Sequence, residues 1–310
     1  MDRLIKKDNT RPKLSIHGLV DGFLNAQDVS QKSLSTYRRT LRKFIDWLEK
    51  SGKINNPDNI TREDILEYKK YLKQLELSPS TISAYLTAVR KFFRWLETKR
   101  IYPNIAEDIK GMKNPKGHRK DCLTELQVKK ALDNIDRSTL KGKRDYALFN
   151  LLVRTGLRTV EIAGARIGDI RRESGQPVLW IRGKGRDEKD DFVILTEKSL
   201  NPIGEYLSSR ESIEKDQPIF ISLSNRNFGK KMTTRSISRV IKRILKSINL
   251  DSNRYTAHSL RHTAITLAIK GGASPRQAQA MARHSDIKTT MAYYHNLNRI
   301  KDGAEKYIDI

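Results

Sequence analysis

The chain has 310 residues, 37% of them hydrophobic, which exceeds one ordinary compact domain and suits two. Its formal net charge of +25 favours a polyanionic partner over solubility alone, because Lys and Arg release the counterions that phosphates hold. The single cysteine, Cys122, excludes an internal disulfide and a cysteine-based metal site, and the lack of a long apolar run predicts a cytoplasmic protein with no membrane partner.

The positive charge is spread over both halves of the chain. Residues 1–106 hold 21 Lys and Arg against 12 Asp and Glu, and the remainder holds 40 against 24. A DNA-binding regulator with a single basic domain would carry most of its positive charge in one half of the chain. We therefore expect both halves to face the nucleic acid.

The first part of the chain is predicted to be helical. Residues 1–14 read as a flexible basic lead-in, and residues 15–106 as a helical, DNA-binding domain of about four helices. Apolar residues fall at helical spacing in one of them, at Tyr37, Leu41, Phe44, Ile45 and Leu48.

Basic residues lie beside these apolar stripes and are the candidate DNA contacts of this domain. Their position off the stripes predicts exposure to solvent or to phosphates. We expect Trp47 and Trp95 to belong to the core or to line a groove rather than to stack on bases. The candidate DNA-binding residues are Arg38, Arg39, Arg42, Lys43, Arg90, Lys91 and Arg94.

Residues 107–122, with Gly, Pro and several Lys, read as a linker to a second domain over 123–310. Thr124 is the expected N-cap of its first helix, and a second helix covers about 142–154. Strands are predicted at 177–183 and 191–195, with 218–222 as a candidate third, followed by helices at about 233–248, 258–270, 275–283, 286–297 and 300–308. The expected fold class is mainly α with a small β-sheet, the second domain being mixed α/β.

The second domain offers cations for DNA-breaking chemistry but few carboxylate pairs. Cleaving a phosphodiester requires either metal ions held by carboxylates or a cluster of Arg and Lys around the phosphate. The acidic run at Asp187, Glu188, Asp190 and Asp191 falls in a predicted turn and reads as a solvated loop. We therefore expect chemistry without a metal or another cofactor.

The candidate site residues occur in four short segments. His258 and Arg261 are three apart, so they share one face of a predicted helix start, where the field is positive toward an anion. Taken singly, each candidate is more often a surface charge, a solvated Lys or a core aromatic. The segments are TGLRTVEI with Arg158 and Glu161, GKG with Lys184, AHSLRHTA with His258, Arg261 and His262, and ARHSDIKTTMAYYH with His284, Tyr293 and Tyr294.

Together these segments resemble the tyrosine recombinase family, of phage integrase-like or Xer type. The order TGLR-x-x-E, GKG, His-x-x-Arg, second His and a Tyr nine residues later is intact, and the helical first part resembles the family's core-binding domain. One departure stands out. The residue before the second His is commonly Gly in the family and is Arg283 here, which could alter local packing or add a phosphate contact.

The resemblance implies a role for each residue. Arg158 and Arg261 would hold the non-bridging oxygens of the scissile phosphate, and Tyr293 would attack to form a 3′-phosphotyrosyl bond. His258 would accept the phenol proton, and Lys184 would protonate the leaving 5′ oxygen. The remaining residues would support these, with His284 bonding the phosphate, Glu161 bracing an arginine or histidine, and His262 lying behind the reacting groups.

The resemblance implies a site-specific recombinase that works as a homo-tetramer on two double-stranded DNA sites, with accessory DNA-binding proteins left open. Integration, excision, inversion and dimer resolution also stay open. The alternatives are relaxation of DNA in the manner of a type IB topoisomerase, and DNA binding without chemistry. Tyr294 is the alternative nucleophile. Ile300, Ala304, Tyr307 and Ile308 fall at helical spacing, so a tail helix packs either on its own domain or on a neighbouring subunit.

Overall fold

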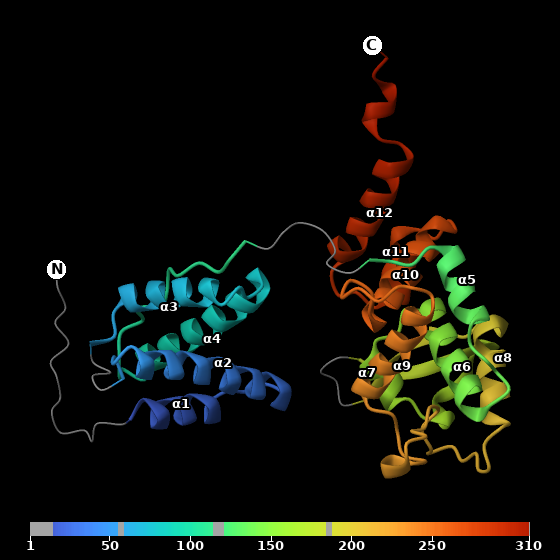
Figure 1. Cartoon of the computed structure of the whole chain (residues 1–310), viewed down its shortest axis with the longest axis horizontal. Coiled ribbons are helices and arrows are strands. Elements are labelled where there is room, and N and C mark those ends of the chain that lie inside the picture. Colours follow the sequence, from blue (N-terminus) through green and yellow to red (C-terminus); the bar gives the residue numbers. More distant parts are fainter. Residues whose placement is uncertain (1–14, 55–58, 114–120, 184–187, 310) are drawn as a thin grey trace. The chain divides into compact units, whose positions relative to one another are not determined.

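A computed structural model describes residues 15–54, 59–113, 121–183 and 188–309. The chain divides into two compact units, Met1–Lys116 and Gly117–Ile310 (Figure 1). Each unit has a hydrophobic core of its own. The units are therefore described one at a time.

The first unit is a bundle of helices whose starts are set by capping residues. Ser78 accepts a hydrogen bond from the Thr81 amide at 3.3 Å, and Pro79 occupies the first turn of its helix, where no amide partner is needed. The sequence-based expectation of about four helices is confirmed. They are α1 (Ile16–Asn25), α2 (Gln31–Lys50), α3 (Arg62–Gln74) and α4 (Pro79–Thr98).

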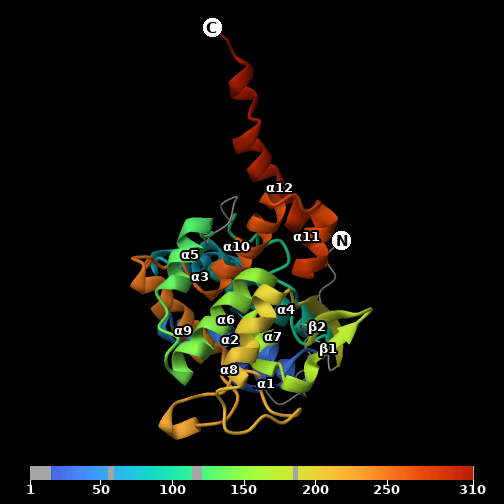
Figure 2. The ribbon, with the colours of Figure 1, turned by 90° about the vertical axis from the view of Figure 1, so that its right-hand side faces the viewer.

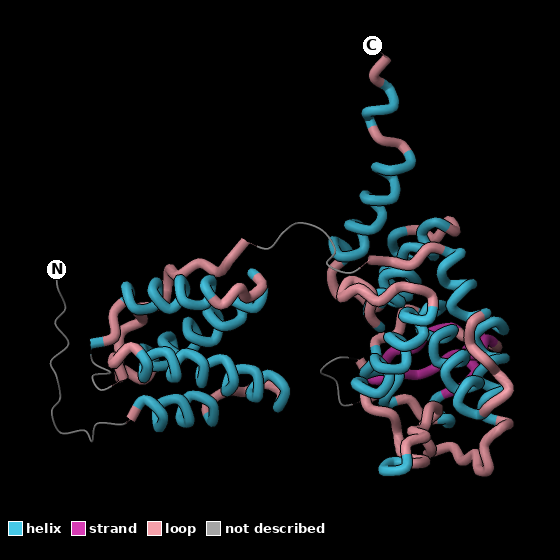
Figure 3. The backbone as a smooth tube through the Cα atoms, in the orientation of Figure 1, coloured by secondary structure: helices cyan, strands magenta, loops and turns pink. Residues whose placement is uncertain are grey.

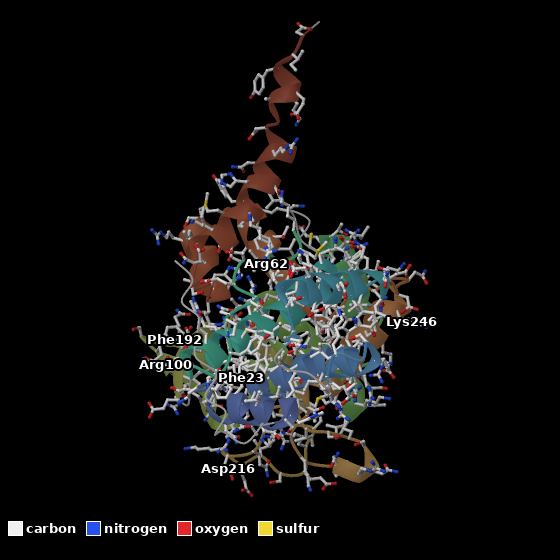
Figure 4. All side chains as sticks on the ribbon, turned by 90° about the vertical axis from the view of Figure 1, so that its left-hand side faces the viewer. Phe23, Arg62, Arg100, Phe192, Asp216 and Lys246 are labelled. Carbon is white, nitrogen blue, oxygen red and sulfur yellow. The ribbon has the colours of Figure 1, made fainter. Side chains whose placement is uncertain are left out.

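Aromatic side chains fill the centre of this bundle. Phe23 is fully buried inside it (Figure 4), and its ring lies edge-on to Phe92 with 5.8 Å between centroids. Trp47 is buried, and Trp95 is half-buried against the core. Edge-to-face packing of this kind adds about 0.5–1.5 kcal/mol per pair beyond the area buried. The aromatics thus build the bundle, as expected from their spacing.

The second unit is mainly helical with a small sheet (Figure 3), which confirms the expected fold class. Its helix α6 is buried on nearly all sides and packs against α8 and α10. The helices are α5 (Glu125–Asp133), α6 (Leu140–Thr155), α7 (Thr159–Gly164), α8 (Glu197–Leu207), α9 (Thr234–Ser247), α10 (Ala257–Lys270), α11 (Pro275–Ala282) and α12 (Ile287–Lys301). Short 3₁₀ turns lie at Ile167–Asp169, Asn225–Asn227 and Ala304–Tyr307.

The sheet is antiparallel in the order β1 (Ile170–Glu173), β2 (Gln176–Arg182), β3 (Lys189–Ile194), with β1 and β2 labelled in Figure 2. The β2 and β3 strands match the two expected strands. The candidate strand at 218–222 was wrong, because those residues form only single bridges, Arg166 to Pro218 and Ile221 to Lys231. The third strand is β1, whose polar sequence IRRE gave no alternation to detect.

Helix α8 was missed from the sequence because Pro202 lies inside it. Proline has no amide hydrogen, so the carbonyl of Lys198 one turn earlier lacks its helical donor. The side-chain amide of Asn150, on α6, donates to that carbonyl at 2.6 Å instead. A neighbouring helix thus supplies the hydrogen bond that the helix itself cannot make.

The last three helices pack on one another around a small apolar cluster that includes Ile265, Ala278 and Tyr293. Figures 1 and 2 agree that the C-terminal end of α12 projects away from α10 and α11. The final helix expected at 300–308 was wrong in extent. Helix α12 runs on to Lys301, and only Ala304–Tyr307 follows as a 3₁₀ turn, with Tyr307 80% exposed.

Across the described ranges, no helix combines the length and apolar character needed to cross a bilayer.

Candidate active site

The TGLR segment is a tight turn between two helices. Gly156 ends α6 with φ 62°, in the left-handed region that favours glycine, and a Cβ there would approach the Ala264 side chain at 3.4 Å. The chain reverses at this point and enters α7, with Arg158 immediately before the helix. The turn therefore presents the Arg158 side chain beside α10.

Arg158 is held by the buried carboxylate of Glu161. Its Nη1 donates to Glu161 Oε1 at 2.7 Å, and its backbone amide donates to Oε2 at 2.6 Å. The Glu161 side chain is 1% exposed and the Arg158 side chain 30%. Glu161 thus braces Arg158 at the α7 start, while part of the guanidinium stays open to an incoming anion.

Arg261 lies in the first half of α10 and is buried against the same turn. Its Nη1 donates to the Gly156 carbonyl at 2.6 Å, and its Nη2 donates to the carbonyl of Ala282. Burial, together with the nearby Arg158 and Arg283 charges, lowers the pKa of Arg261 to about 10. The group remains a cation at neutral pH, and its plane is fixed by two backbone carbonyls.

Arg283 caps the C-terminus of α11 with φ 53° and ψ 49°, the left-handed conformation. A residue other than glycine costs roughly 1–2 kcal/mol in this conformation. Its side chain is 6% exposed and donates from Nη2 to Glu161 Oε2 at 2.8 Å and from Nη1 to the Met281 carbonyl at 2.6 Å. Arg283, in place of the glycine that the resemblance implies, therefore places a third guanidinium near Arg158 and Arg261.

His284 follows directly and is half-buried in this cluster. Its Nδ1 hydrogen-bonds Thr290 Oγ1 at 2.9 Å, and its carbonyl accepts from the Gln279 side chain at 3.0 Å. Burial, followed by the positive charges of Arg261, Arg158 and Arg283, lowers the pKa of His284 to about 4. The imidazole is therefore neutral at pH 7.

Tyr293 lies on α12 with its hydroxyl against Nδ1 of His262, on α10. The residue is 6% exposed, and burial raises the pKa of the phenol to about 12, although the Arg261 charge opposes this shift. Tyr294 is half-buried against the apolar cluster of α10 to α12, and its ring lies edge-on to His295. Tyr293 therefore contacts His262 of α10.

The structure brings together most of the predicted site residues. His258 is exposed at the start of α10, and its ring lies edge-on to His262 with 4.7 Å between centroids. The Tyr293 hydroxyl meets His262, whereas the predicted proton transfer named His258. Lys184 lies outside the described residues.

In the first unit, some of the expected DNA contacts are exposed side chains, and others lie against neighbouring side chains. Arg38, Arg39 and Arg42 are exposed on α2 and line a groove of about 370 Å³ between α2 and the end of α1. Lys43 lies over the Tyr71 ring and Lys91 over the Tyr37 ring, at 5.7 and 5.3 Å. Arg90 is half-buried and donates to Thr87 at 3.0 Å, whereas Arg94 is exposed.

Within the described residues, no group of three or more His, Cys, Asp or Glu side chains lies close enough to hold a metal ion. What the second unit concentrates instead is positive charge around a phenol. The guanidinium groups of Arg158 and Arg283 contact Glu161, while the Tyr293 phenol meets His262 and lies within the field of Arg261. Such an arrangement can bind a phosphate oxyanion and stabilise added negative charge on it.

Comparison with known proteins identifies this arrangement. The sequence profile described as the phage integrase family matches residues 121–299, more than half of the chain. The chain belongs to the phage integrase family. The profile of the phage integrase N-terminal SAM-like domain matches residues 17–100, so both units correspond to family domains.

Curated relatives of this phage integrase family member are tyrosine recombinases. One from Synechococcus elongatus is 31% identical over 188 residues, which cover 60% of this chain and 58% of that protein. The chain thus spans less than two thirds of that relative. Tyrosine recombinase XerD of Listeria innocua is 27% identical over 301 residues, covering 94% of this chain and 99% of the relative.

Solved structures share the fold. XerH site-specific recombinase bound to a palindromic difH substrate superposes with a TM-score of 0.71 at 21% identity, over 92% of this chain and 83% of that one. The Tn1549 transposon integrase in complex with a circular intermediate DNA gives a TM-score of 0.70 at 19% identity, over 91% and 98%. At these identities the likeness establishes the architecture alone.

The sequence did not reveal several contacts of the site. Thr290 bonds His284, and Gly156 and Ala282 hold Arg261 through their carbonyls. Arg283 was singled out in the sequence, but its pairing with Glu161 was not predicted. Thr290 and Gly156 belong to the quoted segments, so their motif membership was a usable signal. No sequence signal indicated the backbone contacts, because every residue has a carbonyl and only the fold determines which carbonyl meets an arginine.

Proposed function

We propose that this chain is a site-specific tyrosine recombinase, which cuts and rejoins double-stranded DNA through a covalent 3′-phosphotyrosyl intermediate on Tyr293. The observation that carries the proposal is the position of the Tyr293 phenol, beside His262 and within the field of Arg261. The curated relatives are tyrosine recombinases, and the XerH structure is a post-cleavage complex with DNA, which supports the same reading.

The arginines would bind the scissile phosphate. Arg158 keeps part of its guanidinium exposed, and Arg261 uses two of its five N–H donors on backbone carbonyls, so donors remain for the non-bridging oxygens. Their positions are fixed before DNA arrives, so little reorganisation is needed in the transition state. Neutral His284, bonded through Nδ1 to Thr290, would donate its other ring N–H to the phosphate.

The phenol would attack phosphorus once DNA displaces it from His262. With a pKa near 12 in the DNA-free chain, Tyr293 is protonated at neutral pH and requires a base. His258, exposed and in ring contact with His262, is the proposed acceptor. Lys184 would protonate the leaving 5′ oxygen. The phosphotyrosyl bond keeps the energy of the broken bond, so a 5′ hydroxyl from another strand can reverse the step without ATP.

We propose a homo-tetramer on two synapsed sites, with Tyr307 and Ile308, exposed by 80% and 66%, docking on a neighbouring subunit. A requirement for accessory DNA-binding proteins stays open. Localisation in the cytoplasm stays a prediction.

Incubation with plasmids that carry two copies of a candidate site tests this function. The candidate site is the sequence recovered from DNA that the wild-type chain traps covalently. We expect exchanged or inverted products with the wild-type chain and none with Tyr293→Phe, while Tyr294→Phe keeps the activity. Relaxation of supercoils without exchange would instead favour a topoisomerase, and unaltered plasmid in the presence of tight binding would favour a non-catalytic protein.

A further inference from the structure

Arg283 stands where a glycine would be easier for the backbone. The left-handed conformation at the α11 C-terminus, φ 53°, suits glycine, and a β-carbon there is strained. A side chain that is kept in such a position needs an interaction that offsets the strain. The contacts of the guanidinium group show what that interaction is.

The guanidinium of Arg283 is buried and aimed into the arginine cluster. With 6% of its side chain exposed, it donates to Glu161 Oε2 at 2.8 Å and to the Met281 carbonyl at 2.6 Å. Its Nε has no hydrogen-bond partner among the described residues. Glu161 is therefore the one counter-charge that the structure describes in contact with this cation.

Glu161 is shared between two arginines. Its Oε1 accepts from the Arg158 side chain at 2.7 Å, and its Oε2 accepts both the Arg158 amide, at 2.6 Å, and the Arg283 side chain. Without Arg283, the single buried carboxylate would compensate Arg158 alone. With Arg283 present, two guanidiniums share one carboxylate, so positive charge remains for an anionic ligand.

The main chain at Arg283 belongs to the same cluster. The carbonyl of Ala282 accepts from Arg261, and the carbonyl of Arg283 accepts from Arg158 Nη2 at 3.5 Å. The side chain of Arg283 ties this carbonyl pair to Glu161. A shift of the α11 end would therefore move both arginine contacts together.

We propose that Arg283 is a positioning residue with two roles. Its guanidinium pairs with Glu161, so that the charge of Arg158 is less compensated and can act on the scissile phosphate. It also fixes the two backbone carbonyls that orient the Arg158 and Arg261 side chains. The inference rests on the proposed recombinase function and deepens it. Arg283 acts through Glu161 and Arg158, and it does not itself touch the reacting atoms.

The test measures covalent cleavage of a nicked duplex that carries the sequence recovered from wild-type covalent complexes. Arg283→Met removes the charge and keeps most of the volume, Arg283→Lys keeps the charge without the planar fork, and Arg276→Met is the matched control on the exposed side of α11. Melting temperatures establish that each variant is folded. The readouts are the first-order cleavage rate at saturating DNA and, separately, the Kd for the duplex.

We expect Arg283→Met to slow cleavage by about tenfold or more, while the Kd changes by less than about threefold. Arg283→Lys should restore part of the rate, and Arg276→Met should cleave like wild type. In a Glu161→Gln background the charge to be neutralised is gone, so adding Arg283→Met should cost less than about threefold.

Three results would overturn the inference. Arg283→Met could cleave as fast as Arg276→Met, it could weaken binding with no change in rate, or it could slow cleavage equally in the Glu161→Gln background. Each would mean that Arg283 is structural or acts independently of Glu161. A wild-type chain that forms no covalent complex with any DNA would instead overturn the recombinase function, and this inference with it.

Discussion

The His284 imidazole lies beside three guanidinium groups, and its protonation state sets how much charge the cluster carries. Burial and the charges of Arg261, Arg158 and Arg283 disfavour the imidazolium, so the ring stays neutral while the arginines stay cationic. A neutral ring can donate one N–H to a phosphate and adds no repulsion to its neighbours. The positive charge of the cluster is therefore carried by the arginines, which do not titrate near pH 7.

We therefore predict that His284 titrates near pH 4 in the DNA-free protein, well below the ordinary value of 6.5. Because the folded pKa lies below the unfolded one, the unfolded chain binds more protons between these values, and His284 makes stability fall as pH drops from about 6.5 to about 4. NMR titration of the ring protons, assigned with His284→Gln, measures the midpoint. A midpoint at or above 6.5 would refute the packing described for this ring.

At the residue scale, the sequence singled out the candidate catalytic side chains that the fold brings together, but not the contacts that hold them. Arg158, Arg261, His284 and Tyr293 were selected by order and spacing, and the fold brings them together. The pairing of Tyr293 with His262 was not foreseen, because which of two histidines four residues apart meets the phenol depends on the angle between α10 and α12. That angle is a tertiary property with no local sequence signal.

At the scale of elements, α8 shows how a helix tolerates an internal proline. Pro202 leaves the Lys198 carbonyl without its helical donor, and the Asn150 amide replaces it at 2.6 Å. The bond is part-buried, and a typical hydrogen bond of this kind contributes about 0.5–1.5 kcal/mol to stability. The packing of α6 on α8 is therefore stabilised by the Asn150 hydrogen bond as well as by contacts between apolar side chains.

Asn150→Ala is predicted to lower the free energy of unfolding by about 0.5–1.5 kcal/mol, because the Lys198 carbonyl then loses its donor. Pro202→Ala in the same chain restores an amide donor to that carbonyl, so the double variant should recover much of the stability. Urea unfolding of the four chains in a double-mutant cycle measures the coupling. Strictly additive effects would show that Asn150 does not serve Pro202.

The elements that the sequence predicted well are the ones with strong periodicity and clear caps. Helices α2 and α4 have long apolar stripes, and α5 begins after Thr124, whose hydroxyl accepts from the Gln127 amide at 3.2 Å. The missed elements lack such signals. Helix α7 is only 6 residues long, and β1 is polar, so both owe their conformation to packing in the second unit.

At the scale of the whole molecule, the first unit is predicted to supply sequence-tolerant affinity for DNA through the α2 groove. Arg38→Ala with Arg42→Ala removes two exposed cations from it, whereas Lys50→Ala removes one at the far end of the same helix. The slope of log Kd against log salt should fall by about 0.9 for each phosphate that the protein no longer neutralises. Equal slopes for the two variants would place the DNA elsewhere on this unit.

Assembly is predicted to depend on the chain end. Tyr307 and Ile308 are exposed, so deletion of residues 304–310 should leave folding and single-site cleavage intact. Synapsis of two sites and strand exchange should fall sharply, because the shortened subunits have no apolar tail to dock on one another. Analytical ultracentrifugation on two-site DNA measures the assembly. Tetramers of undiminished stability after the deletion would assign the tail no docking role.

The chemical identity of the nucleophile is the claim on which this account depends. Covalent complexes formed by the wild-type chain can be trapped on DNA, digested with nuclease and protease, and sequenced by mass spectrometry. The account predicts one modified peptide from α12, with a nucleotide joined through its 3′ phosphate to the phenolic oxygen of Tyr293. A nucleotide on Tyr294, attachment through a 5′ phosphate, or no protein–DNA adduct at all would contradict it.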